Sequence, residues 1–481
     1  MKLNEILKGI KYSIAAGNDN IEVGKLETDS RKIEKGDVFI ALTGLGADGH
    51  NFIRAAVENG AAAVIAEHET ESFGAALIVC ENTRILAAYA AANYYGQSHK
   101  KLKLIGVTGT NGKTTVTHII KQILELKGEK TGLIGTNHYL IGDEELPSSG
   151  TTPEAIELHS IFKKMADEGC KYAVMEVSSH ALALHRCEGL SFEVGVFTNL
   201  TEDHLNYHKD MDDYAAAKSK LFTMSKYSLL NEDDPYYKVM KKAAAGKTVT
   251  YGIKKHADMK AENIVYSQRG ISFTWTYGSS AVPMKMGIPG EFSVYNALAG
   301  IGAAALLGLS DMEIAKGLLI VRGVKGRAEV VPTDTDYTVM IDYAHTPDGL
   351  ENILKTVKGF AEGRVIVVFG CGGDRDAKKR PIMGQIGGKL ADFAVVTSDN
   401  PRTEDPASIV DQVLAGMGGM EKKYKAIVDR TEAIRYALSI AEKGDIVLLA
   451  GKGHETYQDI GGKKIHYDER EIIKEILKKI R

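Results

Sequence analysis

The hydrophobic positions of the chain form short β-branched runs, most of which end at glycine, aspartate or asparagine. Segments with helical spacing, rich in Ala, Leu, Lys and Glu, lie between several of these runs. Continuous apolar strands that alternate with helices indicate parallel sheets covered on both faces. The predicted strands are residues 37–42, 104–108, 172–177, 195–198, 338–341, 364–369, 393–397 and 445–450. We therefore expect an α/β protein whose ligands bind beyond the carboxyl ends of the strands.

Two polar stretches indicate domain boundaries. Residues 96–103 precede a glycine-rich loop, and residues 322–328 precede another strand. With 481 residues, the chain is long enough for about three domains. We expect domains at 1–101, 102–326 and 327–481.

Composition excludes several classes of partner. The formal net charge is −3, so no general attraction to nucleic acids or acidic lipids is expected. The longest nearly apolar run, 297–309, is shorter than the ~18 residues of a membrane-spanning helix and predicts a buried helix. Residues 2–10 have the pattern of one helical face, unlike a signal peptide. We therefore expect neither nucleic-acid binding nor membrane insertion.

The four cysteines are Cys80, Cys170, Cys187 and Cys371. They have neither the spacing of metal ligands nor the density of a disulfide scaffold. We expect mostly structural thiols in a reducing cytoplasm.

A phosphate-binding loop follows the strand at 104–108. It reads Gly109-Thr110-Asn111-Gly112-Lys113-Thr114-Thr115 and precedes a helical run at 116–126. In such a loop, backbone N–H groups and the helix N-terminus face the anion, the lysine reaches the β- and γ-phosphates, and a threonine hydroxyl can bind Mg²⁺. The loop has the short Gly-x-x-Gly-Lys-Thr form, because Val107 stands where the longer form has its first glycine.

Carboxylate and imidazole groups follow two further strands. Glu176 begins Glu-Val-Ser-Ser-His, and His204 lies in Glu-Asp-His-Leu-Asn-Tyr-His. Near a phosphate loop they suit Mg²⁺ bound by few protein ligands and by phosphate oxygens, although either alone would more often lie in a solvated surface cluster. From the residues alone, His208 is expected at the surface, and Lys218, in the helical run 214–222, as a solvated lysine.

Further candidates lie near the second boundary. Asn296 opens the apolar helix and by itself predicts an N-cap or turn residue. Arg327 lies at the boundary, and the strand at 338–341 ends in Asp342-Tyr343-Ala-His345. The acid and aromatic there could hold a ribose and a base, or start a turn.

The last domain carries three polar loops, each directly after a strand. They contain Gly370-Cys-Gly-Gly-Asp-Arg375, Ser398-Asp399-Asn400-Pro401-Arg402 and Gly451-Lys-Gly-His-Glu455. Two guanidinium groups and a carboxylate would complement a ligand with two carboxylates and an ammonium. We expect Arg375, Arg402 and Glu455 to converge on one pocket.

Together these residues resemble the Mur ligases of peptidoglycan synthesis, ATP-dependent enzymes that join an amino acid to a UDP-muramoyl precursor. The resemblance spans nearly the whole chain, from Thr28-Asp-Ser-Arg31 and Gly46-Ala-Asp-Gly49 through the phosphate loop to the Gly-Lys-Gly-His-Glu455 motif. The Asp399-Asn-Pro-Arg402 motif is similar to that of members that add meso-2,6-diaminopimelate to UDP-N-acetylmuramoyl-L-alanyl-D-glutamate. A Mur ligase has an N-terminal UDP-binding domain, a central P-loop ATPase domain with a mostly parallel sheet and a C-terminal Rossmann-like domain that binds the amino acid.

The resemblance also implies roles for individual residues. The UDP-muramoyl-peptide would contact Ser30, Leu45, Gly46, Ala47, Thr151, Thr152, Ser178 and Arg186, and Leu184 stands where the family often has glutamine. ATP would be bound by the phosphate loop together with Asn296, Arg327, Asp342 and His345. Diaminopimelate would contact Arg375, Asp399, Asn400, Pro401, Arg402, Gly451 and Glu455.

For the metal, the resemblance reverses the interpretation of Lys218. This lysine matches the one that the family carbamylates with CO₂, giving an anion that supports Mg²⁺. Thr114, Glu176, His204 and carbamylated Lys218 would be the metal ligands, and Lys113, Glu176, His204 and Lys218 the catalytic residues.

Three alternatives stay open. The first is the same ligase with L-lysine, which the arginine of the Asp-Asn-Pro-Arg motif disfavours. The second is a folylpolyglutamate synthase, which the Thr-Asp-Ser-Arg motif disfavours. The third is a non-catalytic nucleotide-binding relative. We expect a monomer in the cytoplasm.

Overall fold

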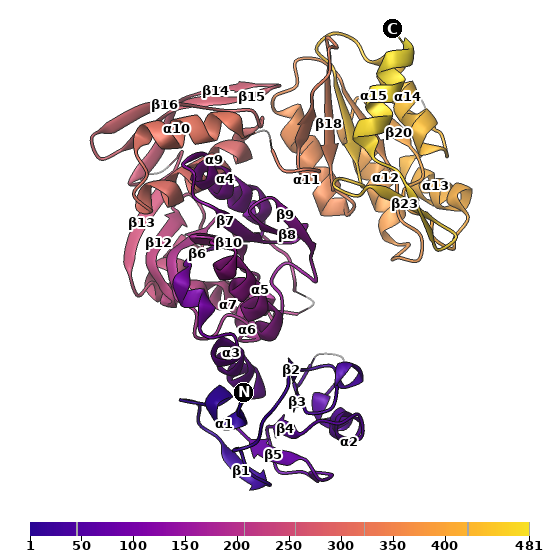
Figure 1. Ribbon diagram of the computed structural model, residues 1–481. Coiled ribbons are helices and arrows are strands. Elements are labelled where there is room, and N and C mark those ends of the chain that lie inside the picture. The colour runs from indigo at the N-terminus through magenta and orange to yellow at the C-terminus, as the bar shows by residue number, and fades with distance from the viewer. Residues whose placement is uncertain (45–46, 206, 255, 322, 421–422, 481) are drawn as a thin grey trace. The chain divides into compact units, whose positions relative to one another are not determined.

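The computed structural model describes residues 1–44, 47–205, 207–254, 256–321, 323–420 and 423–480. It divides into two compact units, one of Met1–Asp258 with Ala299–Ser310 and one of Met259–Leu298 with Asp311–Arg481 (Figure 1). Each unit is described separately below.

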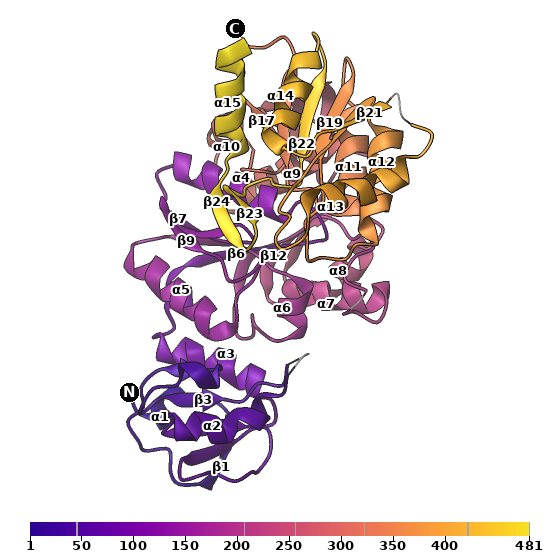
Figure 2. The same cartoon turned by 90° about the vertical axis from the view of Figure 1, so that its right-hand side faces the viewer.

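The first unit begins with a five-stranded sheet of order β1-β5-β4-β3-β2, parallel except for β1. Helices α1 and α3 cover one face and α2 covers the other, because alternate side chains of the strands point to opposite faces (Figures 1 and 2). The elements are α1 (Leu3–Ile6), β1 (Ser13–Ala16), β2 (Leu26–Glu27), η1 (Ser30–Lys32), β3 (Val38–Ile40), η2 (Gly49–Phe52), α2 (Ile53–Glu58), β4 (Ala63–Ala66), β5 (Ala76–Val79), α3 (Thr83–Tyr94) and η3 (Ser98–Lys101).

A second, mainly parallel arrangement of strands follows in the same unit, in the order β13-β12-β11-β6-β10-β7-β8-β9. Strand β6 lies between β10 and β11 and is parallel to both, so the loops after these strands lie at one edge. The elements are β6 (Lys103–Thr108), α4 (Lys113–Leu126), β7 (Thr131–Ile134), β8 (His138–Ile141), β9 (Glu144–Pro147), α5 (Ala155–Asp167), β10 (Tyr172–Glu176), α6 (Ser179–Ala183), β11 (Phe192–Phe197), α7 (Met211–Thr223), β12 (Ser225–Asn231), α8 (Tyr237–Ala243) and β13 (Lys247–Gly252).

The second unit contains an antiparallel meander of three strands and a six-stranded sheet. The six-stranded sheet has the order β17-β18-β22-β19-β20-β21 and is parallel except for β17. The elements of this part of the chain, with α9 divided between the two units after Leu298, are β14 (Met259–Ser267), β15 (Gly270–Tyr277), β16 (Ser280–Met286), α9 (Glu291–Leu306), α10 (Asp311–Ile320), β17 (Glu329–Val331), β18 (Thr338–Asp342), α11 (Pro347–Lys358), β19 (Val365–Phe369), α12 (Lys379–Leu390), β20 (Phe393–Val396), α13 (Pro406–Leu414), η4 (Ala415–Met417), β21 (Tyr424–Ala426), α14 (Arg430–Ile440), β22 (Ile446–Ala450), β23 (Tyr457–Ile460), β24 (Lys463–His466) and α15 (Glu469–Ile480).

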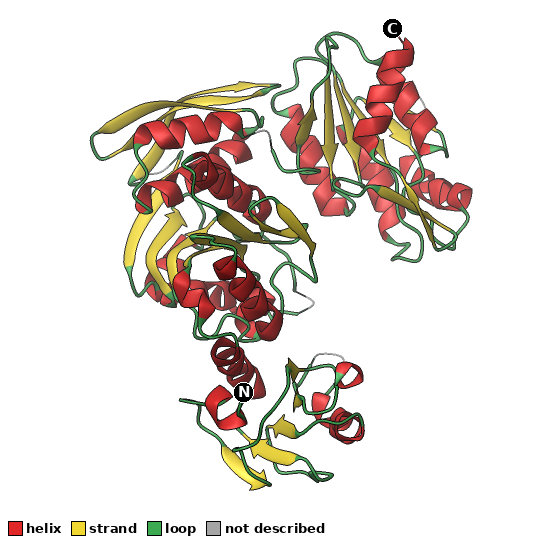
Figure 3. Cartoon of the chain, in the orientation of Figure 1, coloured by secondary structure: helices red, strands yellow, loops and turns green. Residues whose placement is uncertain are grey.

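Helices cover both faces of the six-stranded sheet (Figure 3). Side chains of α11, α12 and α13 pack on one face, and those of α14 and α15 pack on the other. Because both faces are buried, β19 and β22 are apolar at every position, as the sequence pattern predicts.

All eight predicted strands are present, with ends that shift by at most a few residues. The sequence analysis did not predict the antiparallel strands β8, β9 and β14 to β16, whose residues lack continuous apolar runs. The buried apolar helix is α9, and the four cysteines are buried and unpaired, as expected. None of the helices formed by the described residues combines the length and the apolar composition of a membrane span.

Candidate active site

The phosphate loop connects β6 to α4, and two of its glycines are required by geometry. Gly112 precedes α4 with a φ of 85°, in the left-handed region. A Cβ at Gly109 would lie 1.9 Å from Thr198 Oγ1, so no larger residue fits there. The loop therefore approaches the end of β11 closely and leaves the N-terminus of α4, including Thr115 in its first turn, available for an anion.

Lys113 folds back over this loop. Its Nζ donates to the carbonyl oxygens of Gly109 at 2.9 Å and Thr110 at 2.8 Å. These bonds hold the ammonium over the loop, where a bound phosphate would need a positive charge.

Residues after β11 fix the backbone of the loop. The N–H groups of Thr110 and Asn111 donate to Asn199, at 2.8 Å to its carbonyl and 2.9 Å to its side-chain Oδ1. Thr198 Oγ1 donates to the Asn111 carbonyl at 2.6 Å. The loop is therefore held in shape by its own chain, a form of preorganisation for phosphate binding.

Glu176 lies at the end of β10 and is 1% exposed, which excludes the alternative of a solvated surface carboxylate. Its Oε1 accepts hydrogen bonds from Thr114 Oγ1 and from the Thr136 N–H, both at 2.9 Å. Thr136 Oγ1 donates to Oε2 at 3.1 Å. Thr136 was missed in the sequence, although it follows β7, the strand beside β10, and strand ends are where the other candidates were found. The structure thus places the carboxylate against the first turn of α4.

Lys218 is 1% exposed, so the residue-based expectation of a solvated lysine is wrong. The reason is the position of α7, whose inner face carries Tyr214, Lys218 and Leu221 against the sheet. Lys218 Nζ donates to the Gly109 carbonyl at 2.8 Å and lies 4.5 Å from the centre of the Tyr214 ring. Burial, with the nearby Lys113 charge, lowers the pKa of Lys218 well below its usual value, which favours the neutral amine.

His204 follows β11 in a left-handed conformation, with a φ of 56°. Its side chain is half exposed, and its Nε2 lies 3.4 Å from Asp203 Oδ2. Burial lowers the pKa of His204, and the Lys218 and Lys113 charges act in the same direction. A neutral imidazole with an open side can bind a metal or a phosphate group.

His208, expected at the surface, is 2% exposed. Its Nε2 lies 2.9 Å from Ser179 Oγ, and its Nδ1 lies 3.1 Å from Asp213 Oδ2. It therefore joins the loop after β11 to the first turns of α6 and α7. That interior role explains why the surface prediction failed.

The predicted muramoyl-peptide contacts lie beside Glu176. Thr152 Oγ1 donates to the Glu176 carbonyl at 2.8 Å and accepts from the Ser178 N–H at 3.1 Å. Arg186 donates to the Thr152 carbonyl at 2.7 Å and pairs with Glu154 at 2.6 Å. Thr151, Thr152, Ser178 and Arg186 are therefore close to one another.

The remaining predicted contacts of that substrate are less informative. Leu184 and Arg186 line a cavity of about 10 Å³ together with Arg84 and Glu154. Near the five-stranded sheet, Ser30 is buried at the start of η1, and Ala47 is exposed in a loop. Leu45 and Gly46 lie outside the described residues.

Four predicted nucleotide contacts belong to the other unit. Asn296 lies inside α9 and is 6% exposed, so the N-cap prediction is wrong because the helix begins at Glu291. The Arg327 guanidinium lies 5.2 Å from the centre of the Tyr343 ring, and its Nε is buried with no hydrogen-bond partner among the described residues. His345 is exposed, and its Nδ1 lies 2.9 Å from the Tyr343 carbonyl oxygen.

Asp342 is the last residue of β18 and accepts hydrogen bonds from the backbone next to Arg327 and Tyr343. Its two carboxylate oxygens accept from the N–H groups of Ala328 at 2.7 Å and Ala344 at 2.9 Å. Burial raises the pKa of Asp342, although both hydrogen bonds and the Arg327 charge oppose that effect. Asp342 and Arg327 therefore lie close together.

The three polar loops of the last sheet follow β19, β20 and β22, which are neighbours in the sheet. Arg402 has a φ of 51°, and its Nη1 donates to the Gly373 carbonyl at 2.7 Å. A Cβ at Gly372 would lie 2.9 Å from Arg402 Nη1 and 4.0 Å from Arg375 Cγ. The two arginines therefore approach the same glycine, although Arg375 is exposed and donates to the Asp374 carbonyl at 3.2 Å.

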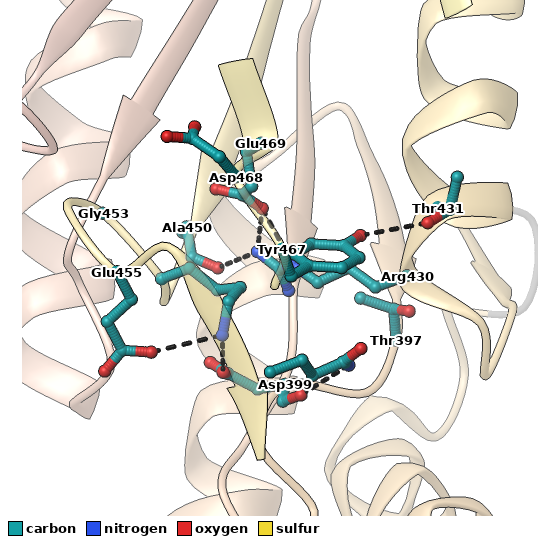
Figure 4. A network of polar contacts seen from close by, with 12 residues as sticks. Thr397, Asp399, Arg430, Thr431, Ala450, Gly453, Glu455, Tyr467, Asp468 and Glu469 are labelled. Carbon is teal, nitrogen blue, oxygen red and sulfur yellow. Dashed lines mark hydrogen bonds and ion pairs between the residues drawn. The ribbon is translucent and has the colours of Figure 1, made fainter. Parts of the chain in front are cut away.

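Glu455, Asn400 and Asp399 form a second group in these loops (Figure 4). Asn400 Nδ2 donates to Glu455 Oε2 at 2.9 Å. A Cβ at Gly451 would lie 2.6 Å from Asp399 Oδ2, which explains the glycine there. Pro401 is buried and continues this loop to Arg402. Lys452 lies in the Gly451-Lys-Gly-His-Glu455 motif, but no role was predicted for it.

A buried arginine joins two of the loops. Arg380 is 1% exposed and pairs with Glu404 through two hydrogen bonds of 2.8 Å. It also donates to the Gly372 carbonyl at 3.3 Å. Arg380 was missed in the sequence because it lies in a helix, five residues beyond the loop.

Three family models match the chain. The Mur ligase family catalytic domain matches residues 22–103, the Mur ligase middle domain matches 107–304, and the Mur ligase glutamate ligase domain matches 326–453.

Two full-length relatives carry the same functional name. The UDP-N-acetylmuramoyl-L-alanyl-D-glutamate--2,6-diaminopimelate ligase of Caldanaerobacter subterraneus subsp. tengcongensis is 48% identical over 479 residues, 99% of each chain. The ligase of that name from Clostridium tetani is 48% identical over 486 residues, all of both chains. A solved structure titled with the same name is 34% identical, has a TM-score of 0.76 and is matched over 100% of this chain and 99% of that one. The chain belongs to the Mur ligase family.

Proposed function

We propose that this protein is an ATP-dependent ligase that joins meso-2,6-diaminopimelate to the D-glutamate of UDP-N-acetylmuramoyl-L-alanyl-D-glutamate. The two relatives at 48% identity, which match the chain from end to end, carry this name. One structural observation supports the chemistry most directly: the phosphate loop, buried Glu176 and buried Lys218 lie at one edge of a sheet.

The first step joins two anions, and the phosphate loop offsets their repulsion. A carboxylate oxygen of D-glutamate attacks the γ-phosphorus of ATP, the bond to the β-phosphate oxygen breaks, and ADP leaves. Lys113 and the N-terminus of α4 stabilise the charge on the transferred phosphoryl group. The product is an acyl phosphate.

The second step needs a neutral amine. The amino group of diaminopimelate attacks the acyl carbon, phosphate leaves as the tetrahedral intermediate collapses, and the nitrogen loses a proton to give the amide. No nucleophilic side chain is required, so positioning supplies much of the catalysis.

Mg²⁺ fits the donor atoms near the loop. Thr114 Oγ1 and Glu176 Oε1, two possible metal ligands, lie 2.9 Å apart. His204, which is half exposed, follows β11, the neighbour of β6 in the sheet. Within the described ranges no three His, Cys, Asp or Glu side chains form a cation site on their own, so ATP oxygens and the Lys218 carbamate would complete the set. When bound, Mg²⁺ would offset the negative charge of the phosphates.

Lys218 is suited to carbamylation. Its neutral amine can attack the carbon of CO₂, forming an N–C bond and releasing one proton, which leaves an anionic carbamate. The observations behind this role are its burial, its hydrogen bond to the Gly109 carbonyl and the lowered pKa.

The other substrates are assigned from neighbouring contacts. Thr151, Thr152, Ser178 and Arg186 would meet the muramoyl-peptide, with Ser30 and Ala47 at the UDP group. Asn296, Arg327, Asp342 and His345 would hold the adenosine part of ATP.

In the amino-acid pocket, Arg402 would bind the distal carboxylate that distinguishes diaminopimelate from lysine, with Arg375 nearby. Glu455, Asn400 and Asp399 would take the second ammonium. L-lysine would leave Arg402 unpaired, at a cost of roughly 2–5 kcal/mol.

Domain limits and assembly complete the proposal. We assign the UDP-binding, ATP-binding and amino-acid-binding domains to 1–101, 102–326 and 327–481, near the ends of the three matched regions. The protein would act as a cytoplasmic monomer.

The test is phosphate release with ATP, Mg²⁺ and UDP-N-acetylmuramoyl-L-alanyl-D-glutamate. We expect release on addition of meso-diaminopimelate and little with L-lysine in parallel. Preference for lysine would overturn the amino-acid assignment, and silence with both would overturn the ligase assignment.

A further inference from the structure

Lys452 is a buried cation that the reaction described above does not use. Its side chain is 0% exposed, and it follows β22 directly. The Nζ lies 3.0 Å from Asn400 Oδ1, 3.2 Å from Glu455 Oε2 and 3.6 Å from Asp399 Oδ1. The rings of Tyr457 and Tyr467 lie 5.7 and 5.9 Å away. The ammonium is thus enclosed by groups from two loops and by two aromatic rings.

These contacts determine which way Asn400 faces. Asn400 Oδ1 accepts from Lys452 Nζ and from the Asp459 N–H at 2.9 Å. With its oxygen taken by two donors, the amide must direct Nδ2 toward Glu455, where it donates at 2.9 Å. The Asp459 N–H and the Glu455 carboxylate favour the same orientation, and Lys452 adds a second donor that holds it.

The same contacts orient Glu455. Asn400 Nδ2 and Lys452 Nζ both donate to Oε2. Among the described contacts, Oε1 is the oxygen that remains for a substrate ammonium. In Figure 4 one oxygen of the Glu455 carboxylate makes the contact with Lys452, and the other points away from Asp399.

The charges of this group set how many cations it can take. Asp399 and Glu455 contribute two negative charges and Lys452 contributes one positive charge, so the net charge is −1. One substrate ammonium would neutralise the group. Without Lys452, the two carboxylates would lose the cation that contacts both of them.

We propose that Lys452 is a positioning residue that makes the pocket select an amino acid with a second ammonium group. It does so by holding Glu455 through Oε2, which leaves Oε1 for that ammonium, and by leaving one negative charge for it. This inference rests on the proposed function and assigns a determinant of selectivity within that site.

The test compares meso-diaminopimelate with 2-aminopimelate, which keeps the attacking amine and both carboxylates but lacks the second ammonium. We expect wild type to prefer diaminopimelate, and Lys452→Met to reduce that preference in kcat/KM by about tenfold or more. The KM for diaminopimelate should rise while the KM for ATP stays within about twofold. A purely structural role would lower kcat/KM for both amino acids by the same factor, which would overturn the proposal.

Lys121→Met is the matched control, because Lys121 is also a buried lysine, paired with Glu125 at 2.6 Å in α4. It should lower thermal stability without changing the preference. If Lys452→Met does not fold, Lys452→Gln keeps a donor without the charge, and it too should lose preference. An unchanged preference in a folded Lys452 variant contradicts the proposal. Absence of diaminopimelate-dependent phosphate release in wild type instead contradicts the proposed function.

Discussion

Two buried lysines, Lys218 in the first unit and Lys452 in the second, have opposite surroundings. Lys218 donates to a backbone carbonyl and lies near a second cation, Lys113, so burial lowers its pKa well below the usual value. Lys452 lies within 3.6 Å of two carboxylates and an amide oxygen. Burial alone therefore does not decide what a lysine does: beside a second cation the neutral amine is favoured, and within reach of two carboxylates the side chain holds its neighbours in place.

The difference fits the chemistry proposed for each place. A neutral amine can react with CO₂, whereas an ion-paired ammonium holds its neighbours in place.

Replacing Lys218 should have the largest effect. We expect Lys218→Ala to lower turnover by roughly a hundredfold or more, because the carbamate oxygens that would hold Mg²⁺ beside the phosphates are lost. With ¹³C-labelled CO₂, wild type should show a carbamate signal in the NMR spectrum that the variant lacks. Lys121→Ala should keep both the signal and the activity. A wild type without the signal would contradict the role given to Lys218.

Arg402→Ala should affect the amino acid alone. Arg402 donates to the Gly373 carbonyl, which leaves the guanidinium without a carboxylate partner among the described contacts. We expect the kcat/KM for diaminopimelate to fall about thirtyfold or more, with the KM for ATP nearly unchanged. Unchanged turnover with diaminopimelate would disprove this specificity assignment.

Arg380 tests whether a buried ion pair in the pocket acts on substrate binding. Arg380→Lys loses the two-pronged contact with Glu404, so the loops that carry Arg402 and Gly372 should loosen. We expect the KM for diaminopimelate to rise about threefold to tenfold. Arg364→Lys is the control, since Arg364 makes a similar pair with Asp445 at 2.7 and 3.0 Å near the opposite ends of the strands. Equal KM values in the two variants would show that the Arg380 pair is structural only.

Two buried histidines extend the comparison to acid stability. Burial lowers the pKa of His99 to about 4 and that of His159 to about 3. The unfolded chain binds these protons near pH 6.5 and the folded chain does not, so stability should fall as the pH drops from about 6.5 to about 4.

Denaturant unfolding of His159→Leu at several pH values would measure this effect. The free energy of unfolding of the variant should depend less on pH than that of the wild type. His466→Leu, at an exposed site where Glu471 raises the histidine pKa, should not flatten the curve. An identical slope for wild type and His159→Leu would contradict the assignment.

The sequence was most informative where a pattern is periodic or repeated. Apolar runs correctly predicted eight of the strands, and residues after those strands predicted the loops around Lys113, Glu176 and Arg402. Parallel strands end at a common edge, so position along the chain was enough to bring these residues together.

Burial of individual polar residues could not be predicted in the same way. Lys218 and His208 lie in segments of ordinary composition, and their burial depends on how α7 packs on the sheet. Asn296 was assigned to a helix start because the apolar run begins after it, whereas α9 begins five residues earlier. Thr136, Arg380 and Lys452 make contacts that depend on the distance between loops, which a single sequence does not contain.

The most direct test of the contrast is the same substitution at both lysines. Calorimetry in CO₂-free buffer without Mg²⁺ would measure the unfolding temperatures of Lys218→Met and Lys452→Met against that of the wild type. Lys218→Met should raise the unfolding temperature by about 2 °C or more, because the buried amine no longer has to lose its proton on folding. Lys452→Met should lower it by about 6 °C or more, because two buried carboxylates lose their cation. A fall of similar size in both variants would contradict the account.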